Sequence, residues 1–175
     1  MSSQKPLMAA RDVLAIIDLF TEHAIELWID GGWGVDALLG RQTREHSDLD
    51  IAMHHEDVPL IRRLVAERGF TDIPRDDTRD CNFVMGDEQG HLVDFHTFSY
   101  DNQGNLNFGL PYPLDSLTGN GMIAGYPVRC ISPEWLVRFH TGYLVDENDY
   151  QDVKAVCEKF EIVIPEDYQS FGKKK

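Results

Sequence analysis

The spacing of hydrophobic residues in the first part of the chain predicts two helices with two short strands between them. Residues 7–23 carry apolar side chains every three or four positions, as an amphipathic helix does. Residues 56–68 repeat this pattern, with Pro59 in the first turn and Gly69 at the C-terminal cap. Between them we expect a strand at residues 27–30, a glycine turn, a short helix that ends at Gly40, and a strand from residue 48.

The rest of the chain predicts two hairpins and two helices. Residues 81–85 and 91–98 flank a polar, glycine-containing turn, and residues 122–131 form a second hairpin pattern. The residues between them, 99–121, have weak periodicity and predict a functional loop or a mobile segment. Ser132 and Pro133 mark the start of a helix at 133–144, which is followed by a helix at 147–160.

This order predicts an α+β fold, a mixed β-sheet flanked by helices with a small C-terminal helical lobe. We place the main domain at residues 1–131 and the lobe at residues 132–170, packed on it as one compact unit. A ligand cleft is expected between the two parts.

Composition narrows the class of partner. The 175 residues are 42% apolar, which predicts a folded protein, and the net charge of −14 argues against broad nucleic-acid binding. The acidic charge suits a small cationic ligand or serves solubility alone. Three cysteines without a CxxC pair give no zinc or disulfide signature. No signal pattern or long apolar run is present, so we expect a cytoplasmic protein without a membrane partner.

The strongest chemical signal is a set of three acids. Asp48 and Asp50 alternate along one strand, so their carboxylates face the same side about 7 Å apart. Asp94 lies in the middle of a later strand, where acids are rare unless they are paired or functional. With a glycine turn upstream, this pattern predicts a triphosphate and magnesium site. The alternative for Asp48 and Asp50 is the solvated face of an edge strand.

Several motifs together resemble a known family. They are Gly31-Gly32-Trp33-Gly34-Val35-Asp36, Thr43-Arg44-Glu45-His46, Asp48-Leu49-Asp50-Ile51 and Leu92-Val93-Asp94-Phe95-His96. They are similar to the antibiotic nucleotidyltransferases of the polymerase-beta-like superfamily. From about residue 10 to residue 157 the chain most resembles the small lincosamide nucleotidyltransferases. The hairpin at residues 121–130 instead resembles the aminoglycoside 2″-nucleotidyltransferase branch.

The resemblance implies the polymerase-beta-like fold and an activity. It implies transfer of AMP from ATP to a hydroxyl of a small antibiotic, a lincosamide first and an aminoglycoside second, with release of pyrophosphate. Asp48 and Asp50 would hold two Mg²⁺ ions. Asp94 would be the general base and a further metal ligand. Lincosamide-type relatives also imply a homodimer.

The same resemblance assigns the nucleotide contacts. Gly31 and Gly32 would bind the triphosphate through backbone N–H groups. Arg41, Arg44 and His46 would contact the β- and γ-phosphates, with a solvated loop as the alternative for each one. Lys154 is a weaker candidate from the helical lobe.

Three other functions stay open at this point. A glycosyltransferase would use the Asp48–Asp50 pair to bind Mn²⁺ and a nucleotide sugar. A nucleotidyltransferase toxin would modify a macromolecule, against which the acidic charge argues. A non-catalytic nucleotide-binding module would not need Asp94. A P-loop enzyme is excluded because the chain has no GxxxxGK[ST] motif.

Overall fold

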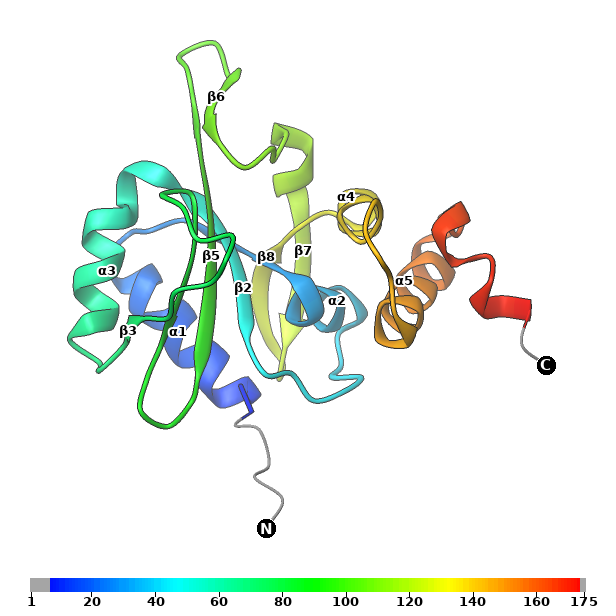
Figure 1. Cartoon of the computed structure of the whole chain (residues 1–175), viewed down its shortest axis with the longest axis horizontal. Coiled ribbons are helices and arrows are strands. Elements are labelled where there is room, and N and C mark those ends of the chain that lie inside the picture. The colour runs from blue at the N-terminus through cyan, green and yellow to red at the C-terminus, as the bar shows by residue number, and fades with distance from the viewer. Residues whose placement is uncertain (1–6, 174–175) are drawn as a thin grey trace.

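The computed structural model describes residues 7–173, and its centre is an eight-stranded mixed sheet with helices around it (Figure 1). The strand order is β3-β4-β5-β2-β1-β8-β7, and β6 pairs with the outer part of β5. The helices are α1 (Ala10–Glu22), α2 (Gly31–Leu39), α3 (Val58–Ala66), α4 (Pro133–Phe139) and α5 (Glu147–Phe160). The strands are β1 (Leu27–Asp30), β2 (Leu49–His54), β3 (Thr71–Asp72), β4 (Asn82–Gly86), β5 (Leu92–Tyr100), β6 (Leu106–Gly109), β7 (Gly119–Ile123) and β8 (Tyr126–Cys130). The predicted mixed sheet flanked by helices is confirmed.

One face of the sheet is closed by α1 and α3. Phe20 of α1 packs edge-on against Phe95 of β5, with ring centroids 6.2 Å apart. The Arg62 guanidinium of α3 lies 4.0 Å from the ring centre of Phe83, the cross-strand partner of Phe95. Because strand side chains alternate, Asp94 and His96 point to the opposite face, which is the one that carries polar groups.

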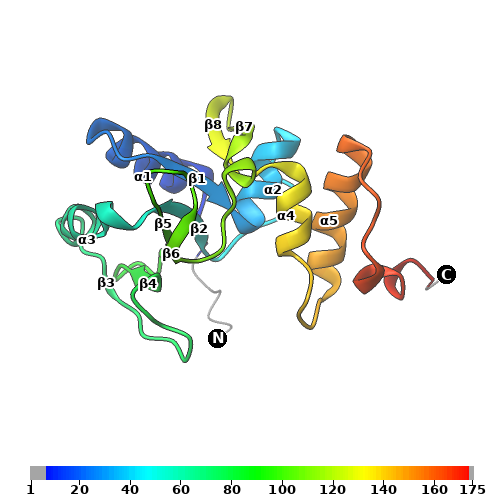
Figure 2. The same ribbon diagram turned by 90° about the horizontal axis from the view of Figure 1, so that it is seen from above.

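Helices α2, α4 and α5 stand next to one another, with α2 packed against the sheet at its β7 end (Figure 2). The Lys159 ammonium of α5 donates a hydrogen bond of 2.7 Å to the Leu38 carbonyl at the end of α2. This bond fits a cation near the C-terminus of a helix, where the carbonyl groups have no partners of their own. The C-terminal helices are therefore anchored on α2; the domain boundary at residue 131 stays a prediction.

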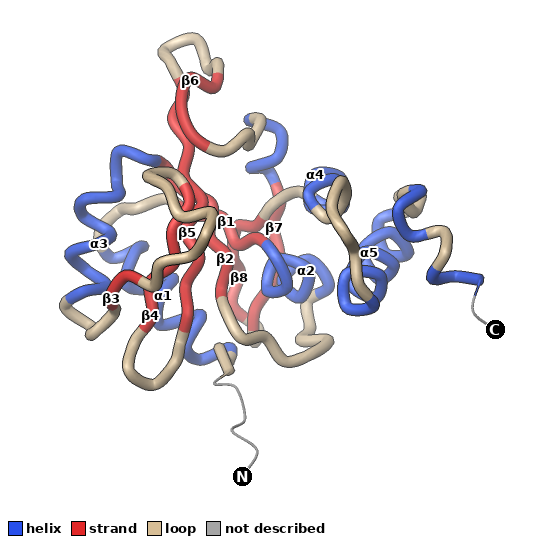
Figure 3. Tube along the Cα trace, in the orientation of Figure 1, coloured by secondary structure: helices blue, strands red, loops and turns tan. Residues whose placement is uncertain are grey.

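The predicted loop at residues 99–121 is wrong. Strand β5 continues to Tyr100 and turns back as β6, and together they form an arm that projects from the sheet (Figure 3). The turn is fixed by Asp101, whose carboxylate accepts the backbone N–H groups of Gln103 and Asn105. A short 3₁₀ helix, Leu114–Thr118, then leads into β7. The hydrophobic periodicity is weak here because both faces of the arm are mostly exposed to solvent, so neither face needs a row of apolar side chains.

Three smaller expectations also need correction. The helix predicted at residues 133–144 ends at Phe139, and the chain reverses through Gly142 with φ +82°. Ser132 precedes this helix, yet its side chain makes no capping hydrogen bond within residues 7–173. Strand β2 begins at Leu49, so Asp48 lies one residue before it.

Across residues 7–173 we find no helix whose length and apolar content would let it cross a membrane.

Candidate active site

Three acids from neighbouring strands stand at one register position. Asp30 of β1 is opposite Asp50 of β2, and Asp50 is opposite Asp94 of β5. Adjacent strands lie about 5 Å apart, so the three carboxylates form a row across the sheet. One ligand atom each from Asp50, Asp94 and His96 lies within 4.8 Å of the others. The fold thus gathers a group of metal-ligand type on the polar face.

The carboxylates of the acid row act electrostatically on one another and on His96. The pKa of Asp50 is raised to about 7. Burial is the largest cause, the nearby carboxylates raise the pKa further, and His96 opposes both by lowering it. Burial lowers the pKa of His96, but the facing carboxylates outweigh this effect and raise it to about 9. Asp94 Oδ1 is buried, lies 3.3 Å from His96 Nε2, and has no hydrogen-bond partner among residues 7–173. An unbonded buried carboxylate oxygen is costly unless a cation joins it.

Asp48 stands at the edge of this group. It is half-buried just before β2, and it is not among the three residues whose ligand atoms converge. Its charge nevertheless acts on the site, because it raises the pKa of both Asp50 and Arg44. Asp48 therefore influences Asp50 electrostatically, as expected for the predicted pair. The carboxylate whose ligand atom converges with that of Asp50 belongs to Asp94.

Helix α2 begins directly at the acid row. The Asp30 carboxylate caps it by accepting the Gly31 N–H at 2.8 Å. Gly31 has φ +57°, and a Cβ there would lie 2.1 Å from Asp50 Oδ2. A Cβ on Gly32 would lie 2.4 Å from His46 Nδ1 and 2.9 Å from Arg44 Nη2. A methyl group at either position would force a neighbouring side chain to move, so the two glycines let the start of α2 lie close to the acid row and to the Arg44–His46 segment.

The predicted basic contacts fall in three different environments. Arg44 is one-third exposed and forms an ion pair with the buried Asp152 of α5, with Nη2 to Oδ2 2.8 Å. His46 is buried, with Nε2 2.5 Å from Asp36 Oδ2 and its ring packed on Trp33. Arg41 is exposed on the loop that follows α2. Arg44 thus flanks Gly32 from the solvent side, and His46 supports it from the interior.

Lys154, the weaker candidate from the helical lobe, forms its ion pair within α5 and not with the loop that carries Arg41 and Arg44. Its side chain is 42% exposed, and its ammonium pairs with Glu158 of the same helix at 3.0 Å.

Sequence reasoning missed Asp30 and Tyr112. The Tyr112 hydroxyl donates to Asp30 Oδ2 at 2.6 Å and lies 3.0 Å from His96 Nδ1. Tyr112 belongs to the segment read as a loop, and its partner Asp30 is 82 residues away, so no local signal joins them. Strand alternation puts His96 on the same face as Asp94, but the sequence gives no signal of its role.

A pocket of about 300 Å³ opens beside the acid row, between the sheet and α4. Its polar floor is formed by Asp30, Gly31, Asp50 and His96. Its walls are mainly apolar and aromatic: Leu110, Pro111, Tyr112, Phe139, His140 and Tyr143. The expected cleft between the sheet and the helical lobe therefore exists, and it holds the convergent polar groups typical of a ligand site.

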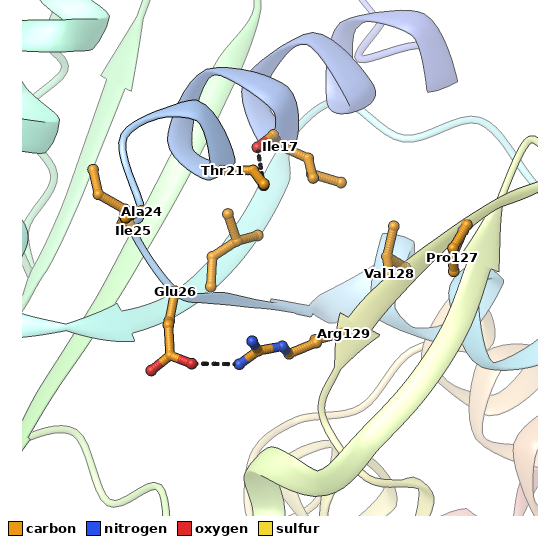
Figure 4. Close-up of a pocket in the computed structure, with 9 residues that line it drawn as sticks. Ile17, Thr21, Ala24, Ile25, Glu26, Pro127, Val128 and Arg129 are labelled. Atoms are coloured by element: carbon orange, nitrogen blue, oxygen red, sulfur yellow. Dashed lines mark hydrogen bonds and ion pairs between the residues drawn. The ribbon is translucent and has the colours of Figure 1, made fainter.

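A larger pocket of about 370 Å³ lies elsewhere, where α1, β1 and β8 meet (Figure 4). The Glu26 carboxylate and the Arg129 guanidinium form an ion pair at its rim, at 2.7 Å. Its lining includes no member of the acid row. The smaller pocket is therefore the candidate active site, because Asp50 and His96 line it beside Asp94.

Comparison with known proteins identifies the family. Residues 12–156 match the family model described as aminoglycoside-2″-adenylyltransferase. The chain belongs to this family. A lincosamide resistance protein of Staphylococcus haemolyticus is 30% identical over 149 residues, which cover 82% of this chain and 91% of that protein. A 2″-aminoglycoside nucleotidyltransferase of Escherichia coli is 32% identical over 140 residues, which cover 77% of this chain and 72% of that protein.

A solved structure agrees with this membership. The lincosamide antibiotic adenylyltransferase LnuA, crystallised with lincomycin, has a TM-score of 0.73 and 25% identity to this chain. The match covers 87% of this chain and 97% of LnuA. The family that the motifs indicated, the antibiotic nucleotidyltransferases, is confirmed, and so is the predicted nucleotidyltransferase fold. The acid row and the glycine start of α2 lie within the residues that match the family model.

Proposed function

We propose that this protein transfers AMP from ATP to a hydroxyl group of a lincosamide antibiotic and releases pyrophosphate. The observation that carries the proposal is the row of Asp30, Asp50 and Asp94 at the glycine start of α2, in a chain of the adenylyltransferase family. Nucleotidyl transfer needs both parts, because it brings a triphosphate and a nucleophilic oxygen together at one charged centre.

The donor set fits Mg²⁺. Asp94 Oδ1 is buried without a hydrogen-bond partner in the described chain, and Asp50 is held among other carboxylates. We propose that Asp50 and Asp94, with Asp48 at the edge, hold two Mg²⁺ ions, which are hard cations that prefer oxygen ligands. When bound, the ions would neutralise charge on the transferred phosphate and lower the pKa of the acceptor hydroxyl.

The remaining roles belong to the chain itself. The N–H group of Gly32 binds a triphosphate oxygen, since the N–H of Gly31 already donates to Asp30, and Arg44 and Arg41 supply positive charge beside it. Asp94 accepts the proton of the acceptor hydroxyl. The acceptor oxygen then bonds to the α-phosphorus while the bond from that phosphorus to the bridging oxygen breaks, and pyrophosphate leaves. We assign His46 a supporting role under Gly32, because its ring is buried against Asp36 and Trp33.

The walls of the pocket favour a lincosamide as the acceptor. Leu110, Pro111, Phe139 and Tyr143 present apolar or aromatic surface, which suits an acceptor with an alkyl side chain and a single amine. A polycationic aminoglycoside would require several free carboxylates. Asp30 already accepts one hydrogen bond at each carboxylate oxygen, which reduces its capacity for a further ammonium group. The aminoglycoside remains the second candidate because the family model carries that description.

The proposal also sets a location and an assembly. We propose the cytoplasm, which supplies ATP and Mg²⁺ and keeps the thiols of Cys81, Cys130 and Cys157 reduced. We also propose a homodimer; light scattering of the purified protein measures it directly, and a mass near 20 kDa would contradict it.

The direct test is a product assay. Pyrophosphate release with ATP and Mg²⁺ is measured against lincomycin, clindamycin, kanamycin and tobramycin separately, and the drug mass is read in parallel. We expect a mass gain of one AMP on the lincosamides. The Asp94→Asn variant should bind ATP but lose turnover. A gain on the aminoglycosides alone would move the acceptor to the second candidate, and no transfer to any of the four drugs would contradict the proposal.

The Arg44–Asp152 pair predicts a selective effect on ATP. Asp152→Asn removes the charge that orients Arg44, and a charge-assisted hydrogen bond contributes about 1.5–3 kcal/mol. We expect KM for ATP to rise about tenfold or more, with kcat changed much less. Glu158→Gln on the same helix is the control, since Glu158 contacts only the exposed Lys154 among the described ion pairs. Equal KM values for the two variants would contradict a role for Asp152 in orienting Arg44.

A further inference from the structure

His96 connects the acid row to Tyr112 through its two ring nitrogens. Nδ1 lies 3.0 Å from the Tyr112 hydroxyl, and Nε2 lies 3.3 Å from Asp94 Oδ1. The hydroxyl has a single proton, and the 2.6 Å contact with Asp30 Oδ2 uses it, because a carboxylate has none to donate. The hydroxyl oxygen must therefore accept the proton of His96 Nδ1–H. Nδ1 of His96 therefore carries a proton, and Nε2 is turned toward Asp94.

This arrangement is the one that metal-binding histidines adopt. Such a histidine binds through one ring nitrogen and donates the other N–H to a neighbouring oxygen, which orients the ring. Here Tyr112 is that neighbour, and Asp30 holds Tyr112 in turn. The Tyr112 ring is also held in place, because it packs against Phe98 and Phe139, with centroid distances of 5.5 Å and 5.2 Å.

We propose that Nε2 of His96 is a metal ligand beside Asp50 and Asp94, so that one of the two Mg²⁺ positions also binds a first-row transition ion, and binds it more tightly than Mg²⁺. The three ligand atoms lie within 4.8 Å of one another, so a small movement brings all of them onto one ion. Mg²⁺ prefers oxygen ligands and keeps its waters, while imidazole nitrogen is a better ligand for transition ions. The inference rests on the proposed metal-dependent transfer.

The test uses Mn²⁺ as the probe on metal-free protein without nucleotide. Free Mn²⁺ is followed by electron paramagnetic resonance, and Mg²⁺ affinity is obtained by competition. Electron spin-echo envelope modulation then reports whether a nitrogen is bonded to the ion. We expect modulation from a coordinated ¹⁴N in the wild-type protein, and this measurement requires no variant to fold.

Two variants separate ligation from support. In His96→Asn the nitrogen modulation should vanish, and Mn²⁺ affinity should fall about tenfold or more while Mg²⁺ affinity falls less. In Tyr112→Phe the ring contacts remain and only the hydroxyl is lost. Mn²⁺ affinity should fall about tenfold there, with the modulation retained. His91→Asn is the matched control, since His91 pairs with Asp87 and Asp12 outside the acid row.

Each contrary result has its own meaning. Mn²⁺ binding that is lost in Asp50→Asn but shows no nitrogen modulation in the wild-type protein would overturn the histidine inference and leave the metal proposal standing. The histidine inference would also be overturned if His96→Asn bound Mn²⁺ as tightly as the wild-type protein does and bound Mg²⁺ as tightly as the wild-type protein does. No Mn²⁺ binding by the wild-type protein would overturn the proposed metal site itself, and this inference with it.

Discussion

Replacing Asp50 with Asn should abolish AMP transfer and, at the same time, stabilise the metal-free protein. Asp50 is the centre of the acid row, with Asp30 on one side and Asp94 on the other. Its pKa is raised from 3.8 to about 7 by burial and by neighbouring carboxylates, which outweigh the attraction of His96. The folded protein therefore holds the Asp50 proton more tightly than the unfolded chain. Stability is lost as pH rises from about 4 to about 7, and it stays low above that range.

The expected size follows from this shift. Three pKa units correspond to about 4 kcal/mol, and the loss of attraction for His96 offsets part of it, so we expect a gain of roughly 2 kcal/mol in the Asn variant at pH 8. For a chain of this size that is about 4–8 °C in Tm. Near pH 4 the wild type and the Asp50→Asn variant should have the same Tm. Adding Mg²⁺ should raise the Tm of the wild type but not of the variant, because only a site that binds the ion is stabilised by it.

Asp76→Asn is the control for this experiment, since Asp76 is an exposed acid away from the sheet. It should change neither the pH dependence of Tm nor the response to Mg²⁺. The explanation would be contradicted by an Asp50→Asn variant that keeps its turnover. It would also be contradicted if the variant and the wild type lost stability in parallel between pH 4 and pH 7.

The unit from β1 to β2 was predictable because its signals are local. Asp30 ends a buried strand and caps α2, and Gly40 ends α2 in the left-handed conformation at φ +72°. Each of these features depends on residues only a few positions apart. The position of Asp94 was predictable for a similar reason, since alternation along β5 sets its face whatever the neighbouring strand is.

The composition of the acid row was not predictable in the same way. Asp30 joins Asp50 and Asp94 because β2 pairs antiparallel with β1 and parallel with β5, and a register between strands is not written in either strand alone. Tyr112 is a stronger case. It reaches Asp30 only after the β5–β6 arm turns the chain back over the polar face. Such tertiary contacts decide which polar groups are held in place, and local patterns carry no information about them.

Gly31→Ala should cause a large loss of activity although it adds only a methyl group. The new Cβ would lie 2.1 Å from Asp50 Oδ2, and Gly31 has φ +57°, where alanine is strained by about 1–2 kcal/mol. Either Asp50 or the start of α2 must move. A displacement of about 1 Å at a reacting centre lowers the rate about 100-fold, so we expect kcat/KM to fall by that factor or more.

Gly40→Ala separates this clash from backbone strain. Gly40 also has positive φ, +72°, but a Cβ there would meet no described atom within 4 Å. It should lower stability by about 1 kcal/mol, as Gly31→Ala does through strain alone, yet keep kcat/KM near the wild-type value. Thermal melting and steady-state kinetics on both variants measure the two effects. If the two substitutions lowered kcat/KM equally, the activity loss would come from weakened folding of α2, and the close approach of Gly31 to Asp50 would not be the cause.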